Sequence, residues 1–355
     1  MFVALRDLRF ARGRFALMGT VIVLITVLVG LLSGLTAGLG RENTSAITAL
    51  PADHLVFSEP ADGGAVSFTD SRLSPGTVAG WSAVPGVARA EPLGISTTKA
   101  EAGRRTAAVS VFGVRPGSAL LPGGAKVSGG GAVLSRKAAE ELDLARGDTV
   151  TLGGRRMPVA AVTGAAMYSH TPVIWTTLDA WRALPGGGDG ATVVALTASG
   201  ADLAAADARL GTTTVTSAAA LEGIGSYTAE NGSLRLMRGF LFAISALVIG
   251  AFFTVWTIQR SGDVAVLKAL GASTGKLLKD ALGQALVLLV LGTGVGAALV
   301  AGLGAVVGRA VPFVLDPSTV LVPALIMIAL GAAGAALSIR RITSVDPLTA
   351  LGSAR

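Results

Sequence analysis

The stretch FALMGTVIVLITVLVGLLSGLTAGL, residues 15–39, decides the fold class of this chain. It carries no charged residue over about 25 positions, whereas a helix needs about 20 mostly apolar residues to cross a bilayer. A cleaved signal peptide is the alternative, but its apolar core is about 7–15 residues long. The length therefore favours a retained transmembrane anchor.

Three further apolar stretches follow toward the C-terminus. They are LMRGFLFAISALVIGAFFTVWTI (236–258), ALGQALVLLVLGTGVGAALVAGLGAVVG (281–308) and VLVPALIMIALGAAGAALSI (320–339). Arg238 lies near the edge of the first of these, where a long basic side chain can reach the membrane interface. Together with 15–39, these stretches predict four transmembrane helices.

The composition agrees with a membrane protein. Hydrophobic residues make up 51% and charged residues 14%, whereas soluble domains carry about a quarter charged residues. The absence of cysteine excludes disulfides, thiolate metal sites and cysteine nucleophiles. The net charge of +7 could indicate a nucleic-acid partner, but residues 41–235 hold 16 basic and 17 acidic residues. The basic excess therefore flanks the apolar spans, and we expect no nucleic-acid partner.

Basic residues in short flanks predict the orientation. The segments 1–14, 259–280 and 340–355 are expected in the cytoplasm, the first as an amphipathic N-terminal segment. The short loop 309–319 and the whole of 40–235 are expected outside. The flanking basic residues are Arg6, Arg9, Arg12 and Arg14, then Arg260, Lys268, Lys276 and Lys279, and finally Arg340, Arg341 and Arg355.

Residues 40–235 predict a large mixed α/β domain inserted between the first and second spans. HLVFS (54–58) and AVSFTD (65–70) alternate as strands do, and Ser74 before Pro75 signals a helix start. Further strands are expected at 88–99, 106–114, 132–134, 149–152, 173–177 and 192–198, and further helices after Ser135, near Asp179 and over 201–210. The glycine-rich stretches 123–131 and 186–190 are expected to be loops.

Small residues recur along the third span. Gly292, Gly296, Gly304 and Gly308 are spaced by four or eight positions, which places them near one helical face. Such a face lets two helices approach closely. The partner is either another helix of the same chain or the same helix of a second copy.

The cytoplasmic stretch QRSGDVAVLKALGASTGKLL (259–278) contains GASTGK, which is not a P-loop. A P-loop has four residues between its glycines and then Lys-Ser or Lys-Thr, whereas three residues separate Gly271 from Gly275 and Leu277 follows the lysine. We find no nucleophile–base pair or metal-ligand cluster either. The chain is therefore expected not to be an enzyme and not to hydrolyse ATP itself.

The same stretch predicts a short helix rather than a plain turn. Ser261 can cap it, and an acidic residue near its start suits the helix dipole. Apolar residues recur at threes and form a ridge, which a solvated turn would not need. We therefore expect a partner-docking helix whose contact residues are Asp263, Val264, Leu267, Lys268 and Leu270.

These residues carry a family resemblance. The segment from Arg260 to Ala272 resembles the signature of FtsX-like permeases, the class that includes MacB-type and lipoprotein-releasing transporters, although Asp263 stands where members usually have Glu. The ending Ser344–Leu351 is similar to the family's ending. Four spans with a large domain after the first match as well, so the resemblance covers essentially the whole chain.

The resemblance implies a type VII ABC transporter permease in a bacterial cell membrane. Such permeases form homodimers, and each copy binds a separate ATPase subunit that holds ATP and Mg²⁺. The docking helix would be the coupling helix seated in the ATPase. ATP binding would then move the stalk and outer domain as levers and expel a substrate near the outer surface, a process called mechanotransmission.

The length and the N-terminal region further resemble the heme exporter permeases of Gram-positive bacteria. In that subgroup heme is held by tyrosine and glutamate at the outer ends of the spans, and heme would be the transported ligand rather than an intrinsic cofactor. Tyrosinate is a known ligand of heme iron. The resemblance implies a site made by Glu42, Tyr168, Tyr227 and Glu230, with Met167 and His170 as reserve ligands.

Ordinary roles compete for each of these residues. Tyr227 could anchor the second span at the membrane interface, and Glu42 could be a solvated carboxylate. The stretch GAAMYSHTPVIW (164–175) could be a plain loop in which His170 caps a turn. Two other functions remain open: efflux of another amphipathic compound, such as an antibiotic, peptide or lipid, and a non-transporting scaffold that signals to cell-wall hydrolases.

Overall fold

The computed structural model describes residues 12–61, 63–259, 262, 266, 270–308 and 310–343. The chain divides into two compact units. The α/β unit comprises Leu39–Gly232, and the helical unit comprises Met1–Gly38 and Ser233–Arg355. The unit boundaries fall inside helices α2 (Arg12–Thr48) and α7 (Tyr227–Gln259). Each of these helices therefore contributes residues to both units.

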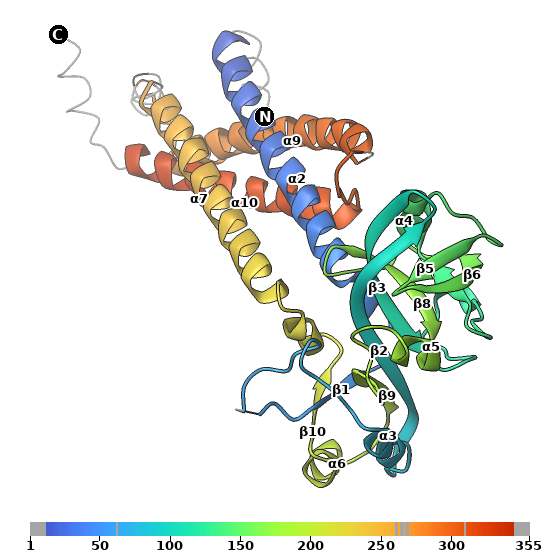
Figure 1. Ribbon diagram of the computed structural model, residues 1–355. Helices are drawn as coiled ribbons and strands as arrows, with labels where there is room; N and C mark the ends of the chain where they lie inside the picture. Colours follow the sequence, from blue (N-terminus) through green and yellow to red (C-terminus); the bar gives the residue numbers. More distant parts are fainter. Residues whose placement is uncertain are drawn as a thin grey trace. The chain divides into compact units, whose positions relative to one another are not determined.

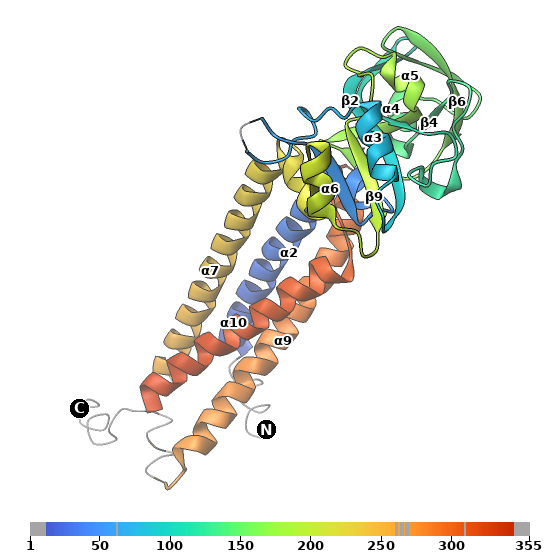
Figure 2. The same ribbon diagram turned by 90° about the horizontal axis from the view of Figure 1, so that it is seen from below.

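The helical unit contains four helices that are long and apolar enough to cross a membrane. They are α2, α7, α9 (Thr274–Val307) and α10 (Pro317–Thr343). Figure 2 shows these helices running lengthwise beside one another. The predicted class, four transmembrane helices with a large α/β domain between the first and second, is confirmed.

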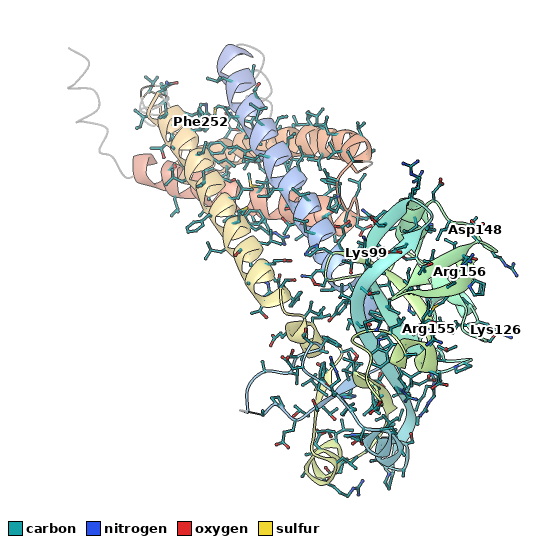
Figure 3. The ribbon with its side chains drawn as sticks, viewed as in Figure 1. Lys99, Lys126, Asp148, Arg155, Arg156 and Phe252 are labelled. Carbon is teal, nitrogen blue, oxygen red and sulfur yellow. The ribbon has the colours of Figure 1, made fainter. Side chains whose placement is uncertain are left out.

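All four helices contribute to one apolar core, which includes Ile22, Phe253, Leu289 and Met327. Every large hydrophobic side chain that is exposed in the described part of the chain lies on this unit, from Leu17 to Leu337. Figure 3 labels Phe252 on the helical unit, where it packs against the apolar core, and shows the charged side chains of Lys99, Arg155 and Arg156 projecting from the α/β unit. An outward apolar surface on long helices is what contact with lipid requires.

The glycine face of α9 packs inside the chain. A Cβ added to Gly296 would come 2.6 Å from Thr26 Cβ, and one added to Gly292 would come 2.9 Å from Ile22 Cγ2. Gly304 lies in the same way against Phe313. One predicted partner for this face was another helix of the same chain, and the structure shows that helix to be α2. The loop before α10 covers the rest of the face.

The α/β unit is built on a 10-stranded sheet with the order β10-β1-β9-β2-β3-β8-β4-β6-β5, and β7 pairs with β8. Figure 1 labels most of these strands. Their bounds are β1 His54–Ser58, β2 Val87–Ala102, β3 Arg105–Val114, β4 Ala132–Leu134, β5 Thr149–Leu152, β6 Arg155–Val162, β7 Met167–Tyr168, β8 Thr171–Thr177, β9 Val193–Ala198 and β10 Thr212–Thr216.

Strand β2 belongs to both halves of the sheet. Its first half pairs with β9, its second half pairs with β3, and Ala100 and Glu101 also pair with β5. The last pairing closes β2, β3, β8, β4, β6 and β5 into a barrel. Figure 1 shows β2 as the long curved strand that connects this barrel with β9 and β1. Closure removes the free edges of that half of the sheet.

Helices cover the barrel and the open half of the sheet. Their starts follow the sequence signals, because Ser74 caps α3 (Pro75–Ser82), Ser135 caps α4 (Arg136–Leu142) and Thr177 caps α5 (Leu178–Arg182). The predicted starts after Ser74 and Ser135 and near Asp179 are confirmed. The remaining helical elements are η1 (Pro122–Gly124), α6 (Leu203–Leu210) and η2 (Ala219–Gly223).

Both faces of the open half are buried. On β1, Leu55 and Phe57 face a core that also holds Ile47 of α2, while Val56 faces a second core with Trp81 of α3. This alternation follows from the two-residue period of a strand. The end of α2 and helix α3 therefore cover opposite faces of the same strand.

One predicted strand is wrong. The stretch AVSFTD (65–70) forms a loop and a turn, in which Ser71 N donates to Ser67 O. The Phe68 side chain is still buried in the core, and its backbone N–H donates a hydrogen bond to Gly223 O. The alternating hydrophobicity of residues 65–70 therefore indicated that Phe68 is buried, but this segment does not pair with a neighbouring strand. The glycine-rich stretch 186–190 is a loop and turn, as predicted.

Most of the predicted docking helix lies outside the described residues. Asp263, Val264, Leu267 and Lys268 belong to that group. Leu270 is described and is 79% exposed.

Candidate functional site

Three chain segments meet at one corner of the α/β unit. The last turns of α2 supply Glu42, Asn43 and Ser45, the turn between β7 and β8 supplies His170, and the first turn of α7 supplies Glu230. These segments are far apart in the sequence: the hydrogen bond between Ser45 and Met167 spans 122 positions, and the contact between His170 and Glu230 spans 60. The fold therefore assembles a polar corner from residues flanking the first and second spans.

Backbone hydrogen bonds hold the β7–β8 turn against α2. Ser169 N donates to Asn43 O over 3.0 Å, and His170 N donates to Glu42 O over 3.3 Å. Ser169 and His170 have φ values of 48° and 61°, which non-glycine residues rarely adopt. Two consecutive left-handed residues match the tight hairpin turn that suits the strand twist. His170 is thus held in place by its turn and by α2.

Glu230 is the centre of a small hydrogen-bonded group. Its Oε2 accepts a 2.9 Å hydrogen bond from Asn43 Nδ2 and lies 2.8 Å from His170 Nε2. Asn43 Nδ2 also donates to Ser226 Oγ over 3.1 Å. We call Asn43, His170, Ser226 and Glu230 the Glu230 cluster.

The members of the Glu230 cluster differ in burial. Asn43 is 2% exposed, and its Oδ1 is buried without a hydrogen-bond partner in the described part of the chain. The side chains of His170 and Glu230 are 34% and 41% exposed. A buried amide thus supports a carboxylate and an imidazole that remain accessible.

Glu42 pairs with a residue outside this cluster. Its Oε1 lies 3.5 Å from Lys137 Nζ of α4. The pair is partly exposed, so its effect on stability is small. The two predicted carboxylates, Glu42 and Glu230, therefore lie at the same corner, because His170 N bonds Glu42 O while its ring contacts Glu230.

Tyr168 lies in the apolar core and not in the Glu230 cluster. It is 6% exposed, and its ring lies edge-on to Phe68 and Phe112 with centroid distances of 5.7 Å. Burial raises the pKa of the Tyr168 phenol above its ordinary value, because a phenolate is poorly solvated there. Coordination of iron by this oxygen would require the core to open.

The other predicted ligands border the same core. Tyr227 is the first residue of α7 and packs, partly buried, against it. Met167 is buried at 6% exposure, and its backbone is bonded to Ser45. Only Glu42, Tyr227, His170 and Glu230 of the predicted set thus offer accessible side chains in this conformation.

The chemistry of the cluster is that of a supported carboxylate–imidazole pair. Glu230 Oε1 and His170 Nδ1 make no hydrogen bond within the described residues, so each can accept a proton or bind a metal centre carried by a ligand. Among the described residues, no group of three or more His, Cys, Asp or Glu side chains could hold a free metal ion. The site therefore suits a ligand that brings its own metal or its own polar groups.

Sequence reasoning missed Asn43, Ser226 and Lys137. Asn43 sits directly after Glu42 in GRENTS, at the end of an apolar span, where a polar residue gives no sign of burial. In the structure, α2 continues to Thr48, nine residues past the predicted end of the span at 39. A helix that continues without a break beyond its membrane span places its next residues in the outer domain.

Comparisons with known proteins agree with this architecture. The MacB-like periplasmic core domain family matches residues 15–213, and the FtsX-like permease C-terminal family matches residues 236–347. The first match alone covers more than half of the chain. The two matches agree with the architecture of this structure, in which a large domain after the first span is followed by three further long helices.

Full-length relatives include two kinds of protein. A Staphylococcus haemolyticus protein provisionally named hemin transport system permease HrtB is 28% identical over 99% of both chains. An uncharacterized ABC transporter permease of Mycobacterium tuberculosis is 27% identical over 99% of both chains. The periplasmic region of MacB from Actinobacillus actinomycetemcomitans aligns at 14% identity with a TM-score of 0.36, covering 51% of this chain and 94% of that one.

The family matches cover both units, and they give the α/β unit a place outside the membrane. The protein is thus a membrane protein with four spans and an extracytoplasmic domain. On these grounds the chain belongs to the FtsX-like, MacB-type ABC transporter permeases.

Proposed function

We propose that this chain is the permease subunit of an ABC efflux transporter that expels heme from the membrane by mechanotransmission. The observation that carries the proposal is the end-to-end similarity to a protein provisionally named a hemin transport system permease, combined with the Glu230 cluster at the corner where the outer parts of α2 and α7 meet. Family membership implies an ATPase partner, so ATP and Mg²⁺ would be bound by that separate subunit.

The distribution of apolar surface supports an amphipathic substrate taken from the membrane. Among the described residues, the α/β unit has no exposed large hydrophobic side chain. A porphyrin, which has two wide apolar faces, would therefore find apolar contacts on the membrane helices. The polar part and the iron could be met by side chains at the outer ends of the spans.

The proposed heme-binding residues are Glu42, Tyr168, Tyr227 and Glu230, with Met167 and His170 in reserve. Glu230 and Tyr227 are available in the present conformation, since neither is buried. Tyr168 would join only after the core around Phe68 and Phe112 loosens. A tyrosinate is a strong ligand of ferric heme, and a neighbouring carboxylate can accept the phenolic proton.

The proposed assembly is a homodimer with one ATPase bound to each copy. The predicted helix over 261–272, with Asp263, Val264, Leu267, Lys268 and Leu270, would dock into the ATPase. Closure of the ATPase pair would move α2 and α7, and these helices run into the α/β unit. The expected setting is the cell membrane of a Gram-positive bacterium, with both termini in the cytoplasm.

A second function rests on another full-length relative. The M. tuberculosis permease has nearly the same identity over the same length, and its name assigns no substrate. Another amphipathic compound, such as an antibiotic, peptide or lipid, is therefore the competing substrate class. A scaffold that drives cell-wall hydrolases is the third possibility and would bind no such compound.

Hemin titration of the purified permease in lipid nanodiscs tests the proposal. We expect a Soret band that saturates with hemin, and faster ATP hydrolysis when the partner ATPase is present. Iron-free protoporphyrin is the control for apolar partitioning, because it has the same ring without the metal. Equal binding of the two porphyrins, or no effect of hemin on hydrolysis, would contradict heme as the substrate.

A further inference from the structure

Asn43 is the only buried residue of the Glu230 cluster. It lies on α2, where its neighbour Glu42 turns to Lys137. Its amide nitrogen donates to Ser226 Oγ, directly before α7, and to Glu230 Oε2 in the first turn of that helix. Asn43 is therefore a direct side-chain link between the two helices that carry the flanks of the α/β insertion.

The cost of this arrangement indicates that it serves more than packing. Asn43 Oδ1 is buried and unpaired in the described part of the chain, and an unmet buried acceptor is unfavourable. An aliphatic residue of similar size would fill the space without that penalty. What an aliphatic residue cannot do is donate two hydrogen bonds in fixed directions.

The hydrogen bond from Asn43 helps to set the orientation of the Glu230 carboxylate, and the bond to Ser226 fixes the direction of the Asn43 amide. Oε2 is held by Asn43 Nδ2 on one side and lies beside His170 Nε2 on the other. Oε1 has no hydrogen-bond partner among the described residues. One carboxylate oxygen is therefore fixed by the protein while the other is left for a ligand, the arrangement by which supporting residues orient a metal-binding side chain.

We propose that Asn43 is a positioning residue: it fixes the Glu230 carboxylate and the His170 ring so that Glu230 Oε1 meets the polar or metal-bearing part of the substrate. The choice of hemin as that substrate rests on the proposed function above. The hydrogen-bonded geometry itself does not depend on which amphipathic molecule is carried.

A double-mutant cycle in the full-length permease tests this role. Asn43→Ala should weaken hemin binding about tenfold or more, the usual effect of removing a supporting residue. In a Glu230→Gln background the same change should have less than about a twofold further effect, because Asn43 acts through Glu230. Thr48→Ala, an exposed change on the same helix, is the matched control and should leave affinity unchanged.

A second readout needs no hemin. The chain has two histidines, His54 and His170, so the ring ¹⁵N signals of His170 can be assigned with a His54→Gln variant. We expect the Nε2–H tautomer in the parent protein, since Nε2 faces the carboxylate. Asn43→Ala should shift the His170 ring signals toward a mixture of tautomers, and Thr48→Ala should not.

The outcomes separate the two proposals. If hemin does not bind but the His170 signals change in Asn43→Ala, the heme function fails and the positioning role stands. If the ring signals are unaltered, or if Asn43→Ala weakens binding equally with and without the Glu230 carboxylate, the positioning role is overturned.

Discussion

His170 Nε2 lies 2.8 Å from Glu230 Oε2, although the two residues are 60 positions apart and belong to a hairpin turn and a long helix. Because both side chains are more than a third exposed, the pair contributes little to stability, about 1 kcal/mol or less. Replacing His170 with Ala should therefore leave the melting temperature of the folded permease nearly unchanged while weakening hemin binding several-fold. Parallel thermal unfolding and hemin titration check this expectation.

The backbone at His170 needs its own control. Its φ of 61° suits glycine better than alanine, so His170→Gly removes the ring without straining the turn. If His170→Gly binds hemin like the parent protein, the ring has no part in the site. If His170→Ala alone unfolds the protein, the turn conformation and not the ring is responsible.

Because Tyr168 is buried, we expect the α/β unit to lose stability at alkaline pH. Burial raises the pKa of its phenol above the ordinary value of about 10, so the folded protein holds the proton more tightly than the unfolded chain. The stabilisation is complete below the ordinary pKa and is lost as the pH rises toward the raised value. Absorbance at 295 nm should show Tyr168 ionising only as the protein unfolds.

Tyr168→Phe separates this effect from general alkaline unfolding. The variant keeps the edge-on ring contacts with Phe68 and Phe112 and removes the ionisable group. Its stability should fall less steeply above pH 10 than that of the parent protein. Identical pH profiles for the two proteins would contradict a buried, neutral phenol.

Local signals predicted the elements of the fold better than their pairing. Ser74 and Ser135 predicted helix starts because capping depends on residues three positions away. The same local alternation gave a false strand at 65–70, since a strand also needs a partner. The pairing of Ala100 with Leu152, which closes the barrel, joins residues far apart and leaves no local mark.

The site shows the same division. The family resemblance grouped Glu42 and Glu230, which lie at the two ends of the inserted domain, in one predicted site. It could not predict that Tyr168 turns into the core while its neighbour His170 turns toward Glu230. That choice depends on the two left-handed residues of the β7–β8 turn and on their hydrogen bonds to α2.

Gly94 should be essential for the barrel. Trp181 is fully buried, donates its Nε1–H to Ser96 Oγ and lies so close that a Cβ on Gly94 would come 2.3 Å from its ring. Gly94→Ala should lower the free energy of unfolding by about 1–3 kcal/mol, the usual cost of overpacking. Gly64→Ala is the control, because an added Cβ there meets nothing within 4 Å. Equal stability of the two variants, measured by denaturant unfolding, would refute the tight Trp181 contact.

Gly296 provides the corresponding test in the helical unit. An added Cβ would come 2.6 Å from Thr26 Cβ, whereas one on Gly294 would meet nothing within 4 Å. Gly296→Leu should therefore separate α9 from α2 and lower the thermal stability of the permease in detergent, while Gly294→Leu should have little effect. If instead Gly294→Leu alone dissociated a dimer, the outward side of α9 would be the seam between copies.

The last test concerns the docking helix predicted over 261–272. Leu267 lies on its apolar ridge with Val264 and Leu270, so Leu267→Asp should prevent the ATPase from binding productively and should abolish substrate-stimulated ATP hydrolysis. Val266 is 54% exposed and lies off the ridge, so Val266→Asp adds the same charge as a matched control and should retain coupling. Co-purification with the ATPase separates loss of binding from loss of coupling. A Leu267→Asp permease that binds the ATPase and transports normally would show that the ATPase docks elsewhere, because a carboxylate buried in an apolar interface without a partner is strongly unfavourable.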